Sequence, residues 1–588
     1  MKFKKFSGVV GLMTVVSLAL AGCGASSSEA VNTKDDGKLI TVDVFDSRAN
    51  YQGIQKGWAA KIFKDKFNVK LNIIAPNVAG GGDTLFDTRS AAGNLGDIVI
   101  TTTGGGRMKK LVKAGLISDM TPYLKGMDNI KKFKKSSEAL AKIAGKDGVW
   151  GLGMGVSTSS PTKPSEGVEP QDEPYIRWDY YREAGYPEIK DMDQFLDVLK
   201  KMQDIARKDQ KDDKVYAISM FKDWDGSGMA FVQHMAAWFG YANQGSAFLK
   251  ADGTDEQTVL TKNGIYQKIL AWLHKAQTMG LVDPDSSSQN WDKIHDKVTN
   301  GKVLLSPFSF LGKPSFNSGE RKAKGVGFAL APLQTMRPYS QGFINEGDLS
   351  YFIGIGSKAK NKQRLVKIIN WLYSPEGVYA SSNGTTACPK GMCWEMKDGE
   401  PVLSEFGEKV QFASEGVEVP AQWGGGIYAD GICALNFPTI APNDIDPETK
   451  QTYNSFLWPS ELKKTNPLLS DWSKHMDGAK TEFEYLNKHK MVMVQAGVPY
   501  SAPEENSAQS ARRTQINSAV VAASWKAALA NSQSDFDKEI KEMTTKADGF
   551  GFKDIQKFDY AAINEHMAMS KKVLKLRSES LKSERSEL

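Results

Sequence analysis

A tryptophan between two acids in a glycine-rich segment is the most suggestive chemistry in this sequence. Residues 222–228 read Lys-Asp-Trp-Asp-Gly-Ser-Gly and follow a run that predicts a strand ending near Met220. Such a segment is poorly suited to a core. The indole of Trp224 could therefore stack on a ligand ring while Asp223 and Asp225 accept hydrogen bonds from hydroxyl groups. The alternative is that Trp224 packs in the core.

Other expected loops carry aromatic and polar side chains of the same kind. Trp423 precedes three glycines, which also indicates a loop. A further set follows the first expected strand, where the loops of a parallel sheet form a ligand crevice. This set consists of Arg48, Asn50 and Tyr51.

No catalytic motif accompanies these residues. The sequence lacks the Gly-x-Ser-x-Gly elbow, the His-Glu-x-x-His motif and the phosphate-binding Gly-x-x-x-x-Gly-Lys-Ser/Thr loop. The 6 histidines are scattered without metal-ligand spacing. We therefore expect a binding protein, not an enzyme, with no cofactor. Paired carboxylates of a glycoside hydrolase could still lie far apart in the sequence, so this alternative stays open.

The first part of the chain alternates between short apolar runs and helical patterns. Such alternation indicates βαβ units, with a parallel sheet and helices on both faces, and hence the α/β fold class. The expected strands are 40–45, 69–74 and 97–101, and the expected helices cover about 54–63, 83–92 and 108–114.

A second unit is expected after residues 150–155, where glycines lead into a Ser/Thr/Pro-rich stretch that ends at Pro174. A chain of 588 residues also suggests more than one core, so two lobes or more are expected. Beyond the stretch, the patterns predict a strand at 215–220, helices near 191–207, 229–239, 264–279 and 362–373, further strands at 303–305, 327–330 and 349–355, and a mostly helical tail from about 508.

The N-terminus has the features of a secretory signal. Lys2, Lys4 and Lys5 precede the apolar run 8–21, and Leu-Ala-Gly-Cys then ends at Cys23. This sequence is similar to the lipobox of bacterial lipoproteins, in which the cysteine is acylated. We predict a signal peptide at 1–22 and a flexible tether at 23–37.

Composition narrows the possible partners. Acids (69) and bases (75) are interspersed and the formal net charge is only +6, so nucleic acid is not expected as a partner. After Cys23, 3 of the 4 cysteines remain. Cys388 and Cys393 could form a disulfide, or the thiols could stay reduced, and Cys433 is left over.

Five segments together resemble bacterial extracellular solute-binding proteins for carbohydrates (family 1), in particular the larger oligosaccharide-binding members. They include Leu-Gly-Asp-Ile-Val, a strand-to-helix return and a Trp-Leu-Tyr-Ser-Pro-Glu-Gly helix end. The resemblance runs from about Leu39 to the C-terminus. The segments are 95–99, 175–185, 349–361, 370–377 and 399–403.

The resemblance implies a two-lobed periplasmic-binding-protein-like (type II) fold, with a hinge of two or three crossing segments. Residues 38–156 with about 349–385 would form lobe 1, and residues 157–348 with about 386–588 would form lobe 2. It also implies an oligosaccharide ligand captured for the permease and ATPase of an ABC importer. We expect a monomer, anchored by lipid to the extracytoplasmic face of the cell membrane. A surface glycan receptor without a transport role is the alternative.

The resemblance adds candidate ligand contacts. Phe308 and Phe310 lie where the family has a cleft strand, and Glu346 precedes a hinge-like strand. Trp178 could also stack on ligand, although its place at a helix start favours the core. Larger members often carry a calcium loop, but residues 208–214 lack its Asn and Gly, so a solvated loop is favoured over a calcium site.

We predict that Cys23→Ala releases the protein from membranes without changing the fold, because two or three acyl chains supply the anchor and the tether makes no core contacts. The measurement is sedimentation of washed membranes followed by detection of the protein. A variant that still pellets with membranes after a high-salt wash would contradict the lipoprotein interpretation.

Overall fold

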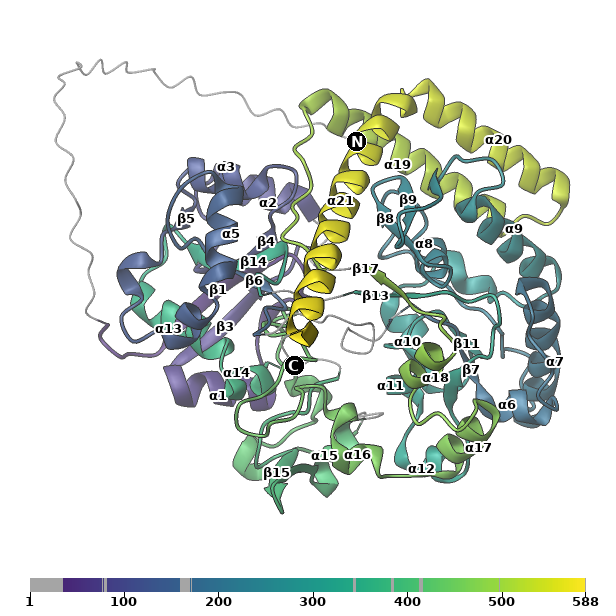
Figure 1. The fold of residues 1–588 in the computed structure, drawn as a ribbon, viewed down its shortest axis with the longest axis horizontal. Helices are drawn as coiled ribbons and strands as arrows, with labels where there is room; N and C mark the ends of the chain where they lie inside the picture. The colour runs from purple at the N-terminus through teal and green to yellow at the C-terminus, as the bar shows by residue number, and fades with distance from the viewer. Residues whose placement is uncertain are drawn as a thin grey trace, which may run out of the picture.

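The computed structural model shows two bodies that lie side by side, each with its own core (Figure 1). It describes residues 35–76, 78, 82–158, 170, 172–341, 345–381, 385–411, 416–495 and 497–586. The predicted signal peptide and Cys23 lie outside these residues. We call the body that contains the N-terminal strands lobe 1 and the other body lobe 2.

A seven-stranded sheet forms the centre of lobe 1, with strand order β2-β3-β1-β4-β14-β5 and β6 paired to β14. The pairs β1–β3 and β1–β4 are parallel, as the alternation of strands and helices predicted, whereas β14 runs antiparallel to β4. The strands are β1 (Ile40–Asp46), β2 (Gly53–Ile54), β3 (Val69–Ile74), β4 (Ile98–Thr102), β5 (Ile117–Ser118), β6 (Leu152–Met154) and β14 (Asp348–Gly356).

The central strand β4 reads Ile-Val-Ile-Thr-Thr and is buried on both faces. The strands β1 and β3 instead alternate buried apolar residues with partly exposed polar residues over most of their length. Successive side chains point to opposite faces, so Val44 and Phe45 belong to different cores. Helices cover both faces. They are α1 (Gly57–Phe67), α2 (Gly82–Ala91), α3 (Arg107–Lys113), α4 (Asp128–Lys132), α5 (Lys134–Ala144), α13 (Lys362–Leu372) and α14 (Pro375–Ala380).

The segment 387–458 also belongs to lobe 1. From the sequence, residues from about 386 onward are expected in lobe 2. The structure differs, because buried side chains such as Trp394 and Trp458 pack in the lobe 1 core, together with Val44 and Trp58. The assignment was wrong for this segment because its partners are distant in the sequence and leave no local pattern. Its elements include the hairpin β15 (Trp394–Lys397) and β16 (Glu400–Leu403), and α15 (Glu405–Gln411).

Lobe 2 is richer in helices than lobe 1. Its strands are β7 (Tyr175–Arg177), β8 (Tyr241–Gln244), β9 (Ala247–Lys250), β10 (Glu256–Thr258), β11 (Leu305–Ser306) and β12 (Phe328–Leu330). The helices before lobe 1 resumes are α6 (Trp178–Glu183), α7 (Met192–Gln210), α8 (Ala230–Ala237), α9 (Ile265–Thr278), α10 (Trp291–Thr299), α11 (Gly312–Phe316) and α12 (Gly319–Ala323).

One expected strand of lobe 2 is not a strand. Residues 215–220 make only isolated bridges, from Tyr216 to Val303 and from Ile218 to Val282, although the segment is buried as predicted. Residues 215–220 are apolar because they are buried, and hydrophobic periodicity alone cannot distinguish a buried strand from another buried segment.

The chain passes between the two cores between Val156 and Tyr175, between Met336 and Leu349, and between Trp458 and Leu468. The strands β13 (Tyr339–Gln341) and β17 (Met493–Gln495) pair beside these passages. The later elements of the chain are α16 (Pro459–Leu462), α17 (Pro467–His475), α18 (Glu482–Lys488), α19 (Ser507–Ala528), α20 (Gln533–Gly549) and α21 (Phe552–Ser586).

A strap formed by residues 497–506 leaves β17 and touches the loop after β4 in lobe 1. The Thr103 and Ser501 hydroxyl oxygens are 3.1 Å apart, and the Gly105 amide donates to the Ala502 carbonyl oxygen at 3.2 Å. The Lys110 ammonium lies 2.8 Å from Glu504 Oε1. The strap therefore ties the helical C-terminal part of lobe 2 to lobe 1.

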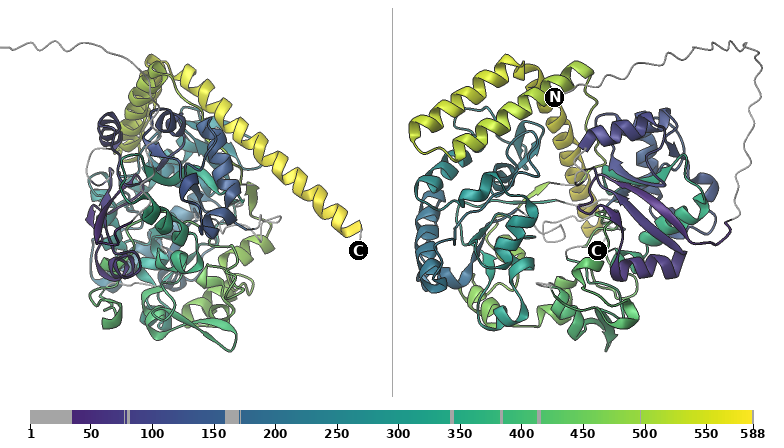
Figure 2. Two further views of the ribbon diagram at one scale, coloured as in Figure 1. Left: turned by 90° about the vertical axis from the view of Figure 1, so that its left-hand side faces the viewer. Right: turned by 180° about the vertical axis from the view of Figure 1, so that it is seen from behind.

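The long helix α21 projects from the body of the molecule, and the left view of Figure 2 shows its C-terminal end reaching beyond all other elements. Within the ranges described above, no helix is both long enough and apolar enough to span a bilayer.

Cys388 and Cys393 form a disulfide, while Cys433 is a buried free thiol. We predict that the double variant Cys388→Ala/Cys393→Ala loses about 2 kcal/mol of unfolding free energy, because the cross-link closes a short loop of the unfolded chain. Urea denaturation measures the loss. A reductant should lower the wild-type stability by a similar amount and leave the variant unchanged. A wild type that is insensitive to reductant would contradict the disulfide.

Candidate ligand-binding site

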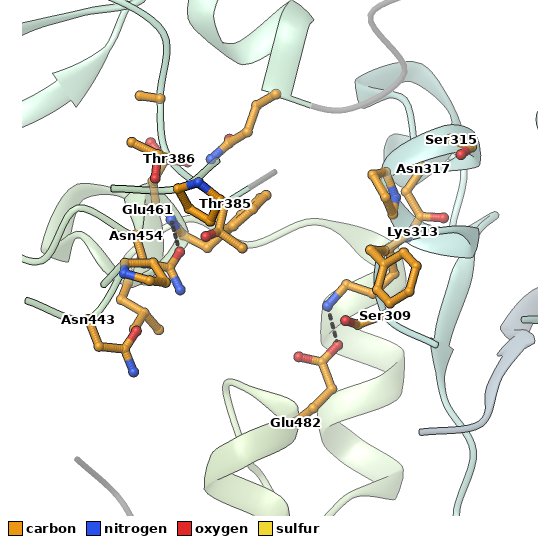
Figure 3. Close-up of a pocket in the computed structure, with 18 of the residues that line it drawn as sticks. Ser309, Lys313, Ser315, Asn317, Thr385, Thr386, Asn443, Asn454, Glu461 and Glu482 are labelled. Atoms are coloured by element: carbon orange, nitrogen blue, oxygen red, sulfur yellow. Dashed lines mark hydrogen bonds and ion pairs between the residues drawn. The ribbon is translucent and has the colours of Figure 1, made fainter. Parts of the chain in front are cut away.

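A cleft of about 2180 Å³ separates the lobes and is lined by residues of both. This volume exceeds the roughly 300–1000 Å³ of a pocket for one drug-sized molecule. In Figure 3, polar side chains of the segment 385–461 face polar side chains of the segment 309–317 across the opening. The cleft can therefore bury an extended polar ligand between two walls that fold separately.

An aromatic cluster lines part of the lobe 2 wall. Trp224 and Trp291 stack with ring centroids 4.8 Å apart, and Phe310 lies 6.1 Å from Trp224. The Phe310 ring is 38% exposed, and its other face stacks on the buried ring of Phe308 at 4.3 Å and 6°. Phe310 thus offers an open apolar face on a rigid support, and the half-buried Trp224 and Trp291 extend the apolar surface beside it.

The two acids beside Trp224 hold its loop in place. The Trp291 amide donates to Asp223 Oδ2 at 2.8 Å, so Asp223 fixes the start of α10. Asp225 accepts from the Ala230 amide at 2.8 Å and from Trp525 Nε1 at 2.6 Å, and burial raises the pKa of its carboxyl. Asp225 faces a second hollow, beside α19, rather than the cleft. Neither acid is among the described residues that line the cleft, so a ligand role for Asp223 and Asp225 stays a prediction that this geometry does not support.

The loop after β1 presents its three predicted residues to the cleft. Arg48, Asn50 and Tyr51 all belong to its lining. Arg48 Nε donates to the Asn436 carbonyl oxygen at 2.9 Å, which joins this loop to the later segment of lobe 1, and the Tyr51 hydroxyl donates to the Ile54 carbonyl oxygen at 2.6 Å. The strand-end argument placed these residues correctly because the sheet edge does border the cleft.

Asp46 anchors the same loop from below. Its side chain is completely buried, and its Oδ1 accepts a hydrogen bond from the Arg48 amide at 2.9 Å. Oδ2 has no hydrogen-bond partner among the described residues. Burial raises the pKa of Asp46 to about 6, because desolvation disfavours the carboxylate more than the nearby amides and Arg48 favour it.

Four other candidates lie away from the cleft surface. Trp178 is fully buried in the core of lobe 2, where Nε1 donates to Asp471 at 2.7 Å, and Phe308 is 1% exposed beneath Phe310. Trp423 packs against the core of lobe 1, and neither it nor Glu346 is among the described residues that line the cleft. The apolar rings of Trp178, Phe308 and Trp423 are equally compatible with burial in a core and with stacking on a ligand. Tertiary packing decides between these two outcomes.

Several lining residues were not anticipated. Trp291 is one of them. The Asn290 side chain accepts a hydrogen bond from the Lys293 amide and caps the helix that begins at Trp291. An Asn before a helical pattern is a sequence signal for a helix start, and it would have placed Trp291 next to a loop. The polar walls gave no signal, since scattered hydroxyl and amide side chains are typical of any surface loop. They include Ser309, Asn317, Thr385, Thr386, Asn443 and Asn454 (Figure 3).

The loop at 208–214, considered above for calcium, is occupied by internal contacts. Asp209 accepts from the Tyr180 hydroxyl at 2.9 Å, and Asp212 pairs with Lys302 at 2.7 Å. Across the described ranges, no group of three or more His, Cys, Asp or Glu side chains is arranged to hold a metal ion.

Comparison with known proteins identifies a family. The sequence profile described as "Bacterial extracellular solute-binding protein" matches residues 46–379. A search of curated proteins finds no match.

Solved structures resemble the chain over most of its length. Alginate-binding protein AlgQ2 without calcium ion has a TM-score of 0.57 and 15% identity, covering 90% of this chain and 98% of that one. The S. pneumoniae ABC-transporter substrate-binding protein FusA in complex with kestose has a TM-score of 0.56 and 13% identity, covering 90% and 99%. An HMO-binding, ABC-transporter-associated solute-binding protein from Bifidobacterium longum infantis has a TM-score of 0.51 and 15% identity, covering 91% and 100%. These similarities show the two-lobed periplasmic-binding-protein-like fold.

We predict that Asp46→Asn changes how stability depends on pH. The folded-state pKa of about 6 lies above the ordinary value of 3.8, so the wild type loses stability through this group as the pH rises from about 4 to above 6. Residue 46 of the variant cannot ionise, and the unfolding free energy of the variant relative to wild type should therefore rise by about 2.4 kcal/mol between pH 4 and pH 7.5. Urea denaturation at both pH values measures this difference. Asp430→Asn, at an exposed position of the lining, should show no such trend, and a pH-independent difference for Asp46→Asn would refute the assignment.

Proposed function

This chain belongs to the family of bacterial extracellular solute-binding proteins, and from this premise we propose that it captures an oligosaccharide in the interlobe cleft and delivers it to an ABC importer. The family match supports binding of a solute outside the cytoplasm. The sugar ligands named for structures of the same fold favour a carbohydrate.

The observation that carries the proposal is the exposed ring of Phe310 inside a polar cleft. A sugar has apolar C–H faces and a rim of hydroxyl groups, so it requires a flat apolar surface surrounded by hydrogen-bonding groups. Phe310 provides such a surface, supported by Phe308, and the polar side chains shown in Figure 3 provide donors and acceptors.

The size of the cleft favours several sugar rings over one. A ligand in a cleft of about 2180 Å³ would touch both lobes and favour their closed arrangement. Hinge motion would require only a few residues of the passages between the lobes to change their backbone dihedral angles. Binding energy gained from both walls would thus be coupled to the angle between the lobes.

We also propose that acylated Cys23 holds the protein at the extracytoplasmic face of the cell membrane, since two or more acyl chains give stable anchoring. Separate permease and ATPase chains would complete the importer.

The experiment that tests the proposed function is a thermal-shift screen of the purified mature protein against oligosaccharides, because a ligand that binds only the folded state raises the melting temperature.

We predict that Phe310→Ala weakens oligosaccharide binding by about tenfold to a hundredfold, the equivalent of about 1–3 kcal/mol of lost apolar burial. The melting temperature without ligand should change little, because the ring is 38% exposed. Titration calorimetry with the best ligand from the screen, together with a melting curve of the free protein, measures both quantities.

The matched control is Phe550→Ala. Phe550 is 37% exposed but lies at the end of α20, outside the cleft lining. Its removal should leave affinity unchanged. Trp224→Ala is less informative, because Trp224 also packs against the buried ring of Phe221 and its loss would lower stability. Unchanged affinity in Phe310→Ala would contradict the placement of the ligand on this ring.

A further inference from the structure

Two lysines of the cleft lining, Lys313 and Lys464, are paired with carboxylates of the protein. Lys313 Nζ lies 2.6 Å from Glu482 Oε1, with the two side chains 28% and 21% exposed, and Figure 3 shows them pointing toward one another. Lys464 Nζ lies 2.7 Å from Glu461 and 2.8 Å from Glu408. In each case the positive charge is already compensated before any ligand arrives.

The Arg48 side chain is also held by protein groups, although by no carboxylate of the described residues. Arg48 donates through Nε to the Asn436 carbonyl oxygen, and its guanidinium group lies 4.6 Å from the Tyr351 ring centroid. Burial lowers the pKa of Lys322 to about 8, the charges of Lys464 and Lys313 act in the same direction, and Glu461 and Glu408 oppose them. Lys56 and Lys480 also belong to the lining but are exposed, where water and salt weaken their attraction for an anion.

The remaining polar lining in Figure 3 is uncharged. Thr385, Thr386, Asn443 and Asn454 lie on the lobe 1 side, opposite Ser309 and Asn317 on the lobe 2 side. Hydroxyl and amide groups both donate and accept hydrogen bonds, as do the hydroxyl groups of a sugar. A neutral sugar chain can therefore exchange its bound water for these groups without leaving a charge unpaired.

We propose that the cleft selects neutral oligosaccharides and discriminates against chains that carry carboxylate or sulfate groups. This inference rests on the proposed function and narrows its substrate class. An anionic sugar would lose its hydration on entering the cleft. It would then find Lys313 and Lys464 already paired with Glu482, Glu461 and Glu408, so contact with these two lysines would not recover the cost of burying its charge. Specificity for neutral chains would come from the unfavourable burial of an anionic group as much as from the hydrogen bonds that a neutral sugar makes.

The test uses uronic acid oligomers in two matched forms, one with free carboxylates and one with the carboxylates converted to methyl esters, beside a panel of neutral oligosaccharides. Calorimetry with the purified mature protein at low salt measures all affinities. We expect binding to members of the neutral panel, and binding to the free acids at least about tenfold weaker than to their esters.

Binding of free acids more tightly than of esters and neutral chains would overturn the inference while leaving the proposed function intact. Absence of binding to every sugar would overturn the proposed function, and the inference with it.

A variant separates charge compensation from cleft shape. Glu482→Gln leaves Lys313 without its carboxylate, so this variant should bind the free-acid oligomers about tenfold more tightly than wild type does, and added salt should remove the gain. Glu484→Gln is the matched control, since it removes the same charge from the exposed side of the same helix, outside the lining. An equal response of both variants would show that overall charge, not the Lys313–Glu482 pair, controls the affinity and would contradict the inference.

Discussion

The indole of Trp58 joins the two parts of lobe 1 on which the cleft depends. It is fully buried, stacks on Tyr428 at 5.5 Å and 15°, and donates through Nε1 to the Tyr428 carbonyl oxygen at 3.1 Å. The backbones approach closely beside it, since a Cβ atom added at Gly57 would lie 2.4 Å from the Gly431 Cα atom. Gln55 extends the junction, donating to the Ile432 carbonyl oxygen and accepting from the Ala434 amide. This junction is one of several contacts that hold the segment 387–458 against the sheet, together with the hydrogen bonds between Arg48 and Asn436.

That segment gives lobe 1 its side of the cleft. The loop 47–51 follows the first strand of the sheet. Asn443 and Asn454 come from a segment of lobe 1 that lies after residues 175–336 of lobe 2 in the sequence. The wall opposite belongs to lobe 2, with its own core. Two walls built on separate cores can keep their internal geometry while the distance between them changes, provided that the passages between them bend. The strap at 497–506 adds a constraint, because its contacts with Thr103 and Lys110 must move with lobe 1 or break.

The cleft combines one open aromatic face with a lining in which Lys313 and Lys464 are paired with carboxylates. Phe310 is exposed only because Phe308 supports it from the core side, and the Trp224 loop beside it is held by hydrogen bonds from α10, α8 and α19. The apolar face is therefore rigid, which lowers the entropic cost of binding a flexible chain. Compensated charges leave dipolar groups to provide most of the polar contacts. Both features suit a ligand whose polarity is spread over many hydroxyl groups.

The sequence alone determined the parallel α/β sheet of lobe 1, the return through β14 and α13, and the place of Arg48, Asn50 and Tyr51 at a sheet edge. These features follow from local periodicity and from the rule that parallel strands end on one side. Only the tertiary structure decided which aromatic rings are exposed, because Trp178, Phe308 and Phe310 have the same apolar character and differ only in what covers them. It also decided that residues 387–458 belong to lobe 1 and that Asp223 and Asp225 accept hydrogen bonds that hold the Trp224 loop. Contacts between residues far apart in the chain fix both outcomes, and such contacts leave no periodic trace in a single sequence.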